Sequence, residues 1–259
     1  MNHHIDPLDA YRRMLVGAEE GAESAWWYLG TTIASPEGFE DIIVNHVETV
    51  MVYRAQELGE GAFRVPWWEI GLFRDAITGE VASDWTNPLT GTPLKAARQF
   101  EEGPSGYSLR RGGDGGIEMF DAVQAFAVLD SATVGARRVG DKLCVTQTEL
   151  KTRSFPGPDG RIPDITEGKA VRSRTVLQFL ADVSDLASGA PSVPASGMYS
   201  FELAVPAWLG FGAMPVQFAV RGLMHKAAMQ DPLNPRGWAD LQLLYPQYFA
   251  DGRLQPQWG

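Results

Sequence analysis

Apolar and polar side chains alternate along most of the chain, and this alternation predicts β-strands. The pattern begins at residues 26–33, where aromatic and β-branched side chains dominate. Segments of the same kind cover residues 42–54, 63–74, 81–86, 143–153, 171–180, 197–205 and 215–221. Short turns rather than helices separate most of them, which favours an antiparallel sheet over a parallel one.

Helical spacing is confined to the two ends of the chain. Asp6-Pro7 is a typical helix start, in which a capping carboxylate precedes a proline. Apolar residues at positions 8, 11, 15 and 18 then share one face of a short amphipathic helix, which we expect to lie on the body of the fold and to end at Gly21. Asn234-Pro235 begins a second helix with Trp238, Leu241 and Tyr245 on one face.

Glycine and proline mark the places where the strands reverse direction. Residues 75–80 predict a hairpin loop with Gly79 in the left-handed conformation, and residues 87–91 predict a second turn. Residues 155–168 and the glycine-rich residues 101–116 are expected to be loops. Residues 117–129 fit either a helix or a strand.

The expected architecture is a closed barrel. With roughly eight to ten strands, closure is the simplest way to remove unpaired edges. No internal repeat and no long linker divides the sequence. We therefore expect residues 1–259 to form a single, mainly β domain, an antiparallel barrel with a short N-terminal helix and a C-terminal helix.

Composition and charge narrow the class of partner. Hydrophobic residues make up 44% of the chain, enough for a sizeable core, and the formal net charge is −10. Nucleic acid and anionic membrane surfaces are therefore poor partners. The N-terminus lacks the order of a signal peptide, and no apolar run is long enough to cross a bilayer. The single cysteine, Cys144, fits a reducing compartment, so we expect a cytoplasmic protein with this thiol buried.

Three motifs combine tryptophan with turn residues: Trp26-Trp27-Tyr28-Leu29-Gly30, Trp68-Glu69 followed by residues 75–81, and Trp85-Thr86-Asn87-Pro88-Leu89-Thr90-Gly91. With Trp208, Met214-Pro215 and Val220-Arg221-Gly222, they make most of the chain resemble a bacterial family of uncharacterised proteins, the domain-of-unknown-function family numbered eighteen thirty-eight. The segment after Gly91 departs from that family because it lacks a stretch containing His and Asn. The resemblance implies a lipocalin-like or calycin-like barrel and little chemistry.

Several kinds of site are disfavoured by the sequence. The only histidines are His3, His4, His46 and His225, too few and too scattered for an ordinary zinc or iron site. The glycine run at residues 112–116 has no following Lys-Ser or Lys-Thr, so it is not a phosphate-binding loop. We expect neither a metal nor a cofactor.

The segment around Glu69 is the most informative candidate site. In a strand, Trp67, Glu69 and Phe73 share one face, with Gly71 between them. Burial between aromatic rings raises the pKa of a carboxyl group, which suits a general acid or base. Gly71 is expected to leave space for a ligand. The alternative is that Glu69 faces outward, or pairs with an arginine such as Arg54 or Arg74.

Three further residues are candidate catalytic groups. His46 alternates with Val44 and Glu48 on one strand face, so Glu48 could orient it as a base, although a structural histidine is the alternative. Tyr53, like Tyr28 and Tyr199, could supply a phenolic donor inside the barrel, with a packing role as the alternative. Arg174, beside Arg172 on one strand face, is expected to anchor a carboxylate or phenolate unless both face solvent.

The aromatic content as a whole predicts a lined chamber. Eight Trp and twelve Phe are concentrated in strand segments, and aromatic cavities bind flat or isoprenoid ligands. The expected lining residues are Trp27, Tyr28, Trp67, Phe73, Tyr199 and Trp208.

These residues predict a cofactor-independent lyase or isomerase that acts on a hydrophobic, aromatic small molecule. Glu69 or His46 would move a proton, and a tyrosine or arginine would stabilise the resulting oxyanion. One alternative is a lipocalin-like carrier of an apolar ligand, and another is an assembly role with the aromatic surfaces buried between subunits. The sequence leaves a homo-oligomer open.

Overall fold

The computed structural model describes residues 5–82, 85–94, 99–123, 127–154, 170–204, 210–227 and 234–258. The helical elements are α1 (Pro7–Leu15), α2 (Val183–Ala187), α3 (Pro235–Leu244) and the short 3-10 helix η2 (Pro246–Tyr248). The strands are β1 (Glu23–Pro36), β2 (Ile42–Arg54), β3 (Gln56–Gly59), β4 (Ala62–Asp75), β5 (Trp85–Thr86), β6 (Pro93–Leu94), β7 (Gln99–Arg111), β8 (Ile117–Val123), β9 (Ala127–Val139), β10 (Lys142–Ser154), β11 (Ala170–Asp182), β12 (Ser196–Ala204), β13 (Val216–Ala227), β14 (Phe249–Ala250) and β15 (Arg253–Leu254).

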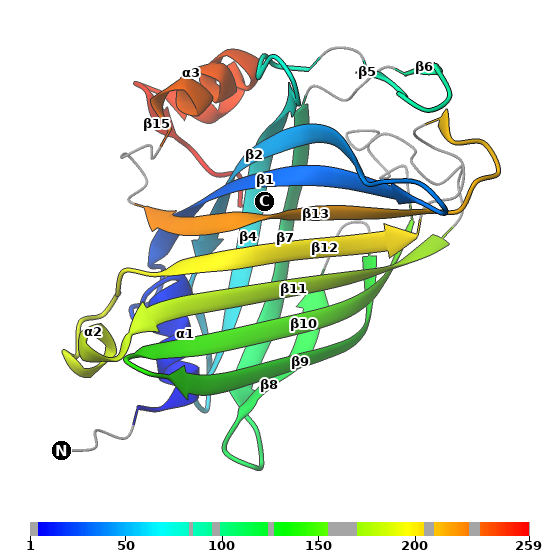
Figure 1. Cartoon of the computed structure of the whole chain (residues 1–259). Coiled ribbons are helices and arrows are strands. Elements are labelled where there is room, and N and C mark those ends of the chain that lie inside the picture. The colour runs from blue at the N-terminus through cyan, green and yellow to red at the C-terminus, as the bar shows by residue number, and fades with distance from the viewer. Residues whose placement is uncertain are drawn as a thin grey trace.

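Ten antiparallel strands form a closed barrel, as the sequence predicts (Figure 1). The large sheet runs in the order β2-β1-β13-β12-β11-β10-β9-β8-β7-β4-β3, and the pairing of β2 with β4 closes it into a ring. The short strand β3 extends β4 beyond the ring. Most neighbours in the ring are consecutive in the chain, because hairpins connect antiparallel strands directly.

Alternate residues of the strands point into the barrel. The largest apolar cluster draws on β1, β2, β4, β7, β8, β10, β11 and β13 together with α1. Since these strands stand around the whole ring, their shared cluster must lie inside it. A second interior cluster, which includes Ala34, Phe201 and Phe218, lies further from α1 and shares Tyr199 and Val220 with the first.

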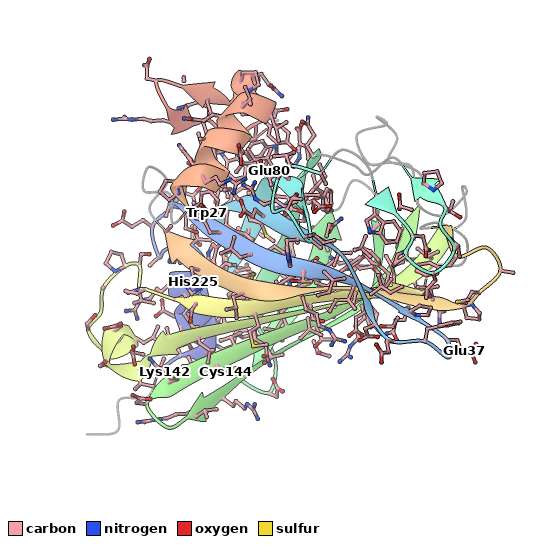
Figure 2. All side chains as sticks on the ribbon, turned by 45° about the horizontal axis from the view of Figure 1, so that its top comes forward. Trp27, Glu37, Glu80, Lys142, Cys144 and His225 are labelled. Carbon is pink, nitrogen blue, oxygen red and sulfur yellow. The ribbon has the colours of Figure 1, made fainter. Side chains whose placement is uncertain are left out.

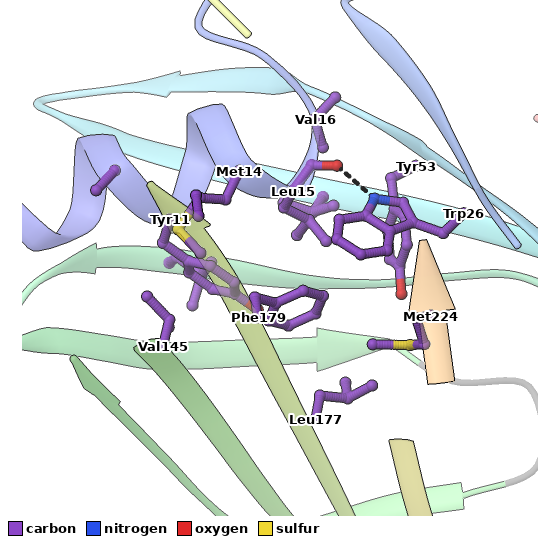
Figure 3. Packing of buried hydrophobic residues seen from close by; sticks show 14 of the residues in the cluster. Tyr11, Met14, Leu15, Val16, Trp26, Tyr53, Val145, Leu177, Phe179 and Met224 are labelled. Carbon is purple, nitrogen blue, oxygen red and sulfur yellow. Dashed lines mark hydrogen bonds between the residues drawn. The ribbon is translucent and has the colours of Figure 1, made fainter. Parts of the chain in front are cut away.

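Helix α1 closes one end of the barrel. Asp6 caps it by accepting a hydrogen bond from the backbone N–H of Asp9 at 2.9 Å. Tyr11, Met14 and Leu15 are fully buried against strand residues such as Phe179, and Trp26 donates to the carbonyl of Leu15 at 2.8 Å (Figure 3). The helix therefore plugs the barrel rather than lying on its surface, and it ends at Leu15, earlier than predicted.

The outer face of one part of the wall is also buried. Residues of β1, β2 and β4 that point outward, among them Trp27, Val50 and Trp68, pack under α3 and the C-terminal segment. The predicted face of α3 is confirmed, because Trp238, Leu241 and Tyr245 all contact this outer cluster. Arg74 links α3 to the barrel wall, because it forms ion pairs with Glu48 of β2 and with Asp240 of α3.

The part of the barrel wall formed by β8 and β9 has few ladder pairs and few buried side chains. Of the described residues of β8 and β9, only Ile117 and Val134 form a ladder pair. Most side chains of both strands are half-buried or exposed. This part of the wall is therefore packed less fully than β1, β2 and β4, although Ile117, Met119 and Val134 still contact the interior cluster.

Several expectations for single segments need correction. Residues 101–116 are not a loop, because most of them belong to β7, which bends at a bulge next to Gly103. Residues 117–129, which fitted either a helix or a strand, are strand in their described part, since residues 117–123 form β8 and residues 127–129 begin β9. Residues 81–86 are not a continuous strand, since they contribute one bridge at Val81 and the two-residue strand β5. Residues 155–168, expected to be a loop, lie outside the described residues.

The two predicted turns are confirmed. Gly79 has a φ of 70° and donates its N–H to the carbonyl of Asp75. Asn87 accepts backbone N–H bonds from Leu89 and Thr90. Within the described part of the chain, no helix has the length and apolarity that crossing a lipid bilayer requires.

Candidate functional site

Glu69 lies on the inner face of the barrel, as predicted. Its neighbours at alternate positions of β4, Trp67 and Phe73, pack against the interior cluster, whereas Trp68 and Ile70 face the outer one. Glu69 is only 8% exposed, and the hydroxyl of Thr49 donates to its Oε2 at 3.3 Å. The strand alternation thus places a carboxylate in the barrel interior.

The space beside Glu69 is not open at Gly71. A side chain at Gly71 would collide with the ring of Phe100, which lies directly over this glycine from the neighbouring strand β7. The expectation that Gly71 leaves room for a ligand is therefore wrong. A glycine is needed at residue 71 because the aromatic ring of Phe100 occupies the space that a side chain would take. The Phe100 ring also contacts Phe73, with 5.3 Å between the ring centroids.

Two phenols lie close enough to Glu69 to respond to its charge. Burial is the main cause that raises the pKa of Tyr28 and of Tyr53 above the ordinary value, and the negative charge of Glu69 adds to the shift in both. Tyr28 also contacts Tyr199 edge-on, with ring centroids 5.0 Å apart. Both phenols therefore stay protonated and can donate hydrogen bonds at neutral pH.

His46 does not join this group. It pairs across the ladder with Thr31 and Arg74, and its Nδ1 lies 3.1 Å from the hydroxyl of Thr31. Residues 48, 50 and 52 of the same strand face the outer layer, whereas Met51 and Tyr53 face the interior. His46 therefore points outward and does not face the interior with Glu69, which agrees with the alternative of a structural histidine.

Two more predicted residues, Arg174 and Trp27, do not line the interior. Arg174 is exposed on the outer face of β11, where it borders an open surface depression of about 540 Å³ together with Arg172 and Glu202. Trp27 lies in the outer layer, 5.8 Å from Trp238 between ring centroids (Figure 2). Trp208 lies outside the described residues. Tyr28, Trp67, Phe73 and Tyr199 do contact the interior cluster, as predicted.

The interior also contains an ionisable group that the sequence analysis missed. On β10, Gln147, Glu149 and Lys151 continue the inner face begun by Leu143 and Val145. Glu149 forms an ion pair with Lys151 and accepts a hydrogen bond from Gln147. The signal was present in the sequence, because these polar residues share the parity of the two apolar residues before them.

This chain of contacts reaches α1. The hydroxyl of Tyr11 donates to the side-chain oxygen of Gln147, and it lies 3.3 Å from the hydroxyl of Tyr107 on β7. Burial raises the pKa of both phenols. The inward polar residues form what we call the polar layer: Tyr11, Tyr28, Thr49, Tyr53, Glu69, Tyr107, Gln147, Glu149, Lys151 and Thr175.

Some buried hydroxyls in the interior have no protein partner among the described residues. They belong to Tyr28, Thr32, Ser105 and Thr175. A buried hydroxyl without a hydrogen bond costs roughly 1–3 kcal/mol, so folded proteins seldom keep one unless water or a ligand satisfies it. The interior is therefore more polar than predicted and contains unused hydrogen-bonding capacity.

The described residues include no group of three or more His, Cys, Asp or Glu side chains arranged to hold a metal ion. The chain matches no family model and no curated protein. The resemblance to the bacterial family of uncharacterised proteins therefore stays a prediction.

Proposed function

We propose that the protein is a cofactor-independent lyase or isomerase that transfers a proton to or from a hydrophobic, aromatic small molecule bound inside the barrel. Glu69 is the proton-transferring group in this proposal. Tyr28 and Tyr53 donate hydrogen bonds to the oxyanion that develops on the substrate.

One observation carries the proposal. The carboxylate of Glu69 is buried in the barrel interior together with two phenols, Tyr28 and Tyr53, whose pKa values are raised mainly by burial and further by the charge of Glu69. A carboxylate beside neutral phenolic donors can remove a proton from carbon while the donors stabilise the enolate or phenolate oxygen. The aromatic rings of Trp67 and Phe73 on the same strand face supply apolar contact for the rest of the substrate.

The roles first expected of His46 and Arg174 pass to other residues. Both side chains lie on the outer face, so neither can reach a molecule held next to Glu69. The tyrosines replace Arg174 as oxyanion donors, and Glu69 carries the proton in place of His46. A cytoplasmic location remains part of the proposal, and the single cysteine supports it.

Deuterium exchange on a panel of candidate substrates tests the proposal. Aryl ketones and aryl aldehydes are incubated with the protein in D2O, and deuterium incorporation next to the carbonyl group is followed by NMR. We expect the protein to accelerate exchange for at least one compound. The Glu69→Gln variant should lose about 10²- to 10⁴-fold of that acceleration, the usual contribution of a general base.

Glu118→Gln is the matched control. Glu118 is exposed and pairs with Arg110 on the barrel surface, so its replacement should leave exchange unchanged. Exchange that survives intact in Glu69→Gln would exclude Glu69 as the proton carrier.

A carrier of an apolar ligand is the second candidate function. The hydroxyls of Tyr28, Thr32, Ser105 and Thr175, which have no partner among the described residues, favour it because they suit a bound molecule whether or not a reaction follows. A carrier would bind members of the same panel without accelerating exchange.

A further inference from the structure

Thr175 presents a hydroxyl group to the barrel interior without any partner in the described part of the chain. Its side chain lies on the inner face of β11 with only 4% exposure, and Oγ1 makes no hydrogen bond to any described residue. A valine has the same shape and would avoid the cost of burying an unpaired hydroxyl. The threonine therefore fits a role in contact with a guest molecule better than a role in packing.

A fixed ion pair stands directly beside this hydroxyl. Thr175 pairs across the ladder with Glu149, and Lys151 is two residues further along β10. Gln147 and Lys151 both contact the Glu149 carboxylate, and Tyr11 in turn holds Gln147. The carboxylate and the ammonium are thus held in place before any guest arrives, which lowers the entropy lost on binding.

The charge balance of the pair indicates which guests fit. Among the described residues, one ammonium faces one carboxylate at this point of the interior, and both are buried. A guest carboxylate would add a second negative charge to one positive charge in a medium of low dielectric, where repulsion is strong. A hydroxyl or carbonyl group adds no net charge and can exchange hydrogen bonds with a hydroxyl such as that of Thr175.

This group of residues faces the same interior as Glu69. Burial raises the pKa of Tyr53 most, and the charges of Glu69 and Glu149 both add to that shift. Tyr53, Glu69 and Glu149 come from strands β2, β4 and β10, and all three side chains are buried on the inner face of the barrel.

We infer that Thr175 and the Glu149–Lys151 pair form a subsite that binds an uncharged hydroxyl or carbonyl group of the substrate. The inference rests on the proposed function, in which Glu69 acts on another part of the same molecule. It narrows the substrate class to hydrophobic alcohols, phenols and ketones and excludes carboxylic acids.

Three matched probes test the subsite: toluene, p-cresol and p-toluate, which share one ring and differ only in the group opposite the methyl. Dissociation constants are measured by NMR titration of the full chain. The wild-type protein should bind p-cresol at least about tenfold more tightly than toluene or p-toluate, a preference of about 1.4 kcal/mol. Thr175→Val should bind p-cresol and toluene equally, with toluene affinity unchanged.

Two controls separate a lost hydrogen bond from a disturbed fold. Thr175→Ser keeps the hydroxyl and should keep the preference for p-cresol. Thr152→Val removes a hydroxyl that bonds Asp130 near the barrel surface and should change no affinity.

The outcomes that overturn the inference differ from those that overturn the proposed function. Tight p-cresol binding that persists in Thr175→Val would reject the subsite and leave the interior site standing. A preference for p-toluate would reject the claim that the subsite binds an uncharged group. Failure of the wild-type protein to bind any of the three would reject both the subsite and the interior aromatic site.

Discussion

The end of the barrel that α1 closes and the polar layer beyond it are built from the same strands, but they differ in how their side chains contribute to stability. Near α1, Leu143 and Val145 of β10 meet Phe179 of β11 and the rings of Tyr11 and Trp26. Two residues further along β10, the inner face carries Gln147, Glu149 and Lys151. The change from apolar to ionisable side chains occurs within one strand.

The difference indicates that the apolar end stabilises the fold, whereas the polar layer serves binding or chemistry. Apolar packing stabilises a fold in proportion to the area that it removes from water. Buried charges and unpaired hydroxyls stabilise it little or reduce its stability, and such groups are retained where binding or chemistry needs them. We therefore expect substitutions near α1 to weaken folding. In the polar layer, replacing an unpaired hydroxyl by an apolar group, or both members of the ion pair together, should leave the fold intact.

The largest effect is expected at Phe179. This ring is fully buried and lies 5.2 Å from Trp26 and 5.5 Å from Tyr11 between centroids. Phe179→Ala should lower the free energy of unfolding by about 3–5 kcal/mol, because it removes a large side chain and leaves a cavity. Urea denaturation measures the loss. Phe120→Ala, at a ring that is 41% exposed on β8, is the control and should change stability by less than about 0.5 kcal/mol.

The ion pair in the polar layer should respond differently to single and double substitution. Lys151→Met leaves the buried Glu149 charge without its ammonium partner and should cost about 3 kcal/mol. Glu149→Gln combined with Lys151→Met removes both charges and keeps an acceptor for Gln147. The double variant should recover most of the loss in the same urea experiment. If it is as unstable as Lys151→Met alone, the pair contributes to folding directly and the comparison fails.

Lys226 is an ionisable exception near α1. Its Nζ donates to the carbonyl of Arg13 and to the hydroxyl of Ser192, and burial lowers its pKa from about 10.5 to about 7. The folded state therefore binds a proton less readily than the unfolded state, so stability rises as the pH increases from 7 to 10.5 and is constant below 7 with respect to this group.

Lys226→Met should remove that rise and increase stability at pH 7 by about 1–2 kcal/mol, after the loss of two hydrogen bonds is set against the removed charge. The free energy of unfolding at pH 7 and pH 9 measures both effects. Lys142→Met, at an exposed lysine paired with Asp182, should keep the rise between these pH values. An unchanged pH dependence in Lys226→Met would show that Lys226 is not its source.

The smallest effect is expected at Tyr28. Its phenol oxygen is buried without a partner in the described part of the chain, although the ring packs against Tyr199. Tyr28→Phe should therefore raise stability by up to about 1 kcal/mol, while the proposed proton transfer loses an oxyanion donor and slows about tenfold or more. Thermal unfolding and the deuterium-exchange assay together would detect the expected gain in stability and the loss in exchange rate. A drop in both quantities would mean that the phenol supports the fold.

Strands with one buried face were predictable from their alternation alone. The bounds of β2 and the inner face of β4 agree with the prediction, because successive side chains of a strand point to opposite faces and the apolar, β-branched residues favour a strand. The strand β7 was missed because its glycines and charges are typical of loops. Gly103, with a φ of 119°, lies at the bulge where the strand bends.

The candidate site was only partly predictable because alternation does not say which face is inside. On β2, Val50 and Val52 are buried as fully as Met51 and Tyr53, since α3 covers the outside of this wall. The alternation on β2 could not show that His46 faces outward, because the apolar residues that share its face are buried under α3. That burial depends on contacts between distant parts of the chain. Glu149 and Lys151 were missed for a simpler reason, because charged side chains in a strand usually face solvent.

The account depends most on the claim that the polar layer is maintained for a bound molecule and not for folding. Urea denaturation of Thr175→Val alongside the wild-type protein, with p-cresol affinity measured on the same samples, tests it directly. We predict an unfolding midpoint equal to or above that of the wild-type protein together with a loss of p-cresol preference. A clearly lower midpoint with unchanged p-cresol affinity would show that the hydroxyl of Thr175 serves the fold, and would contradict the account.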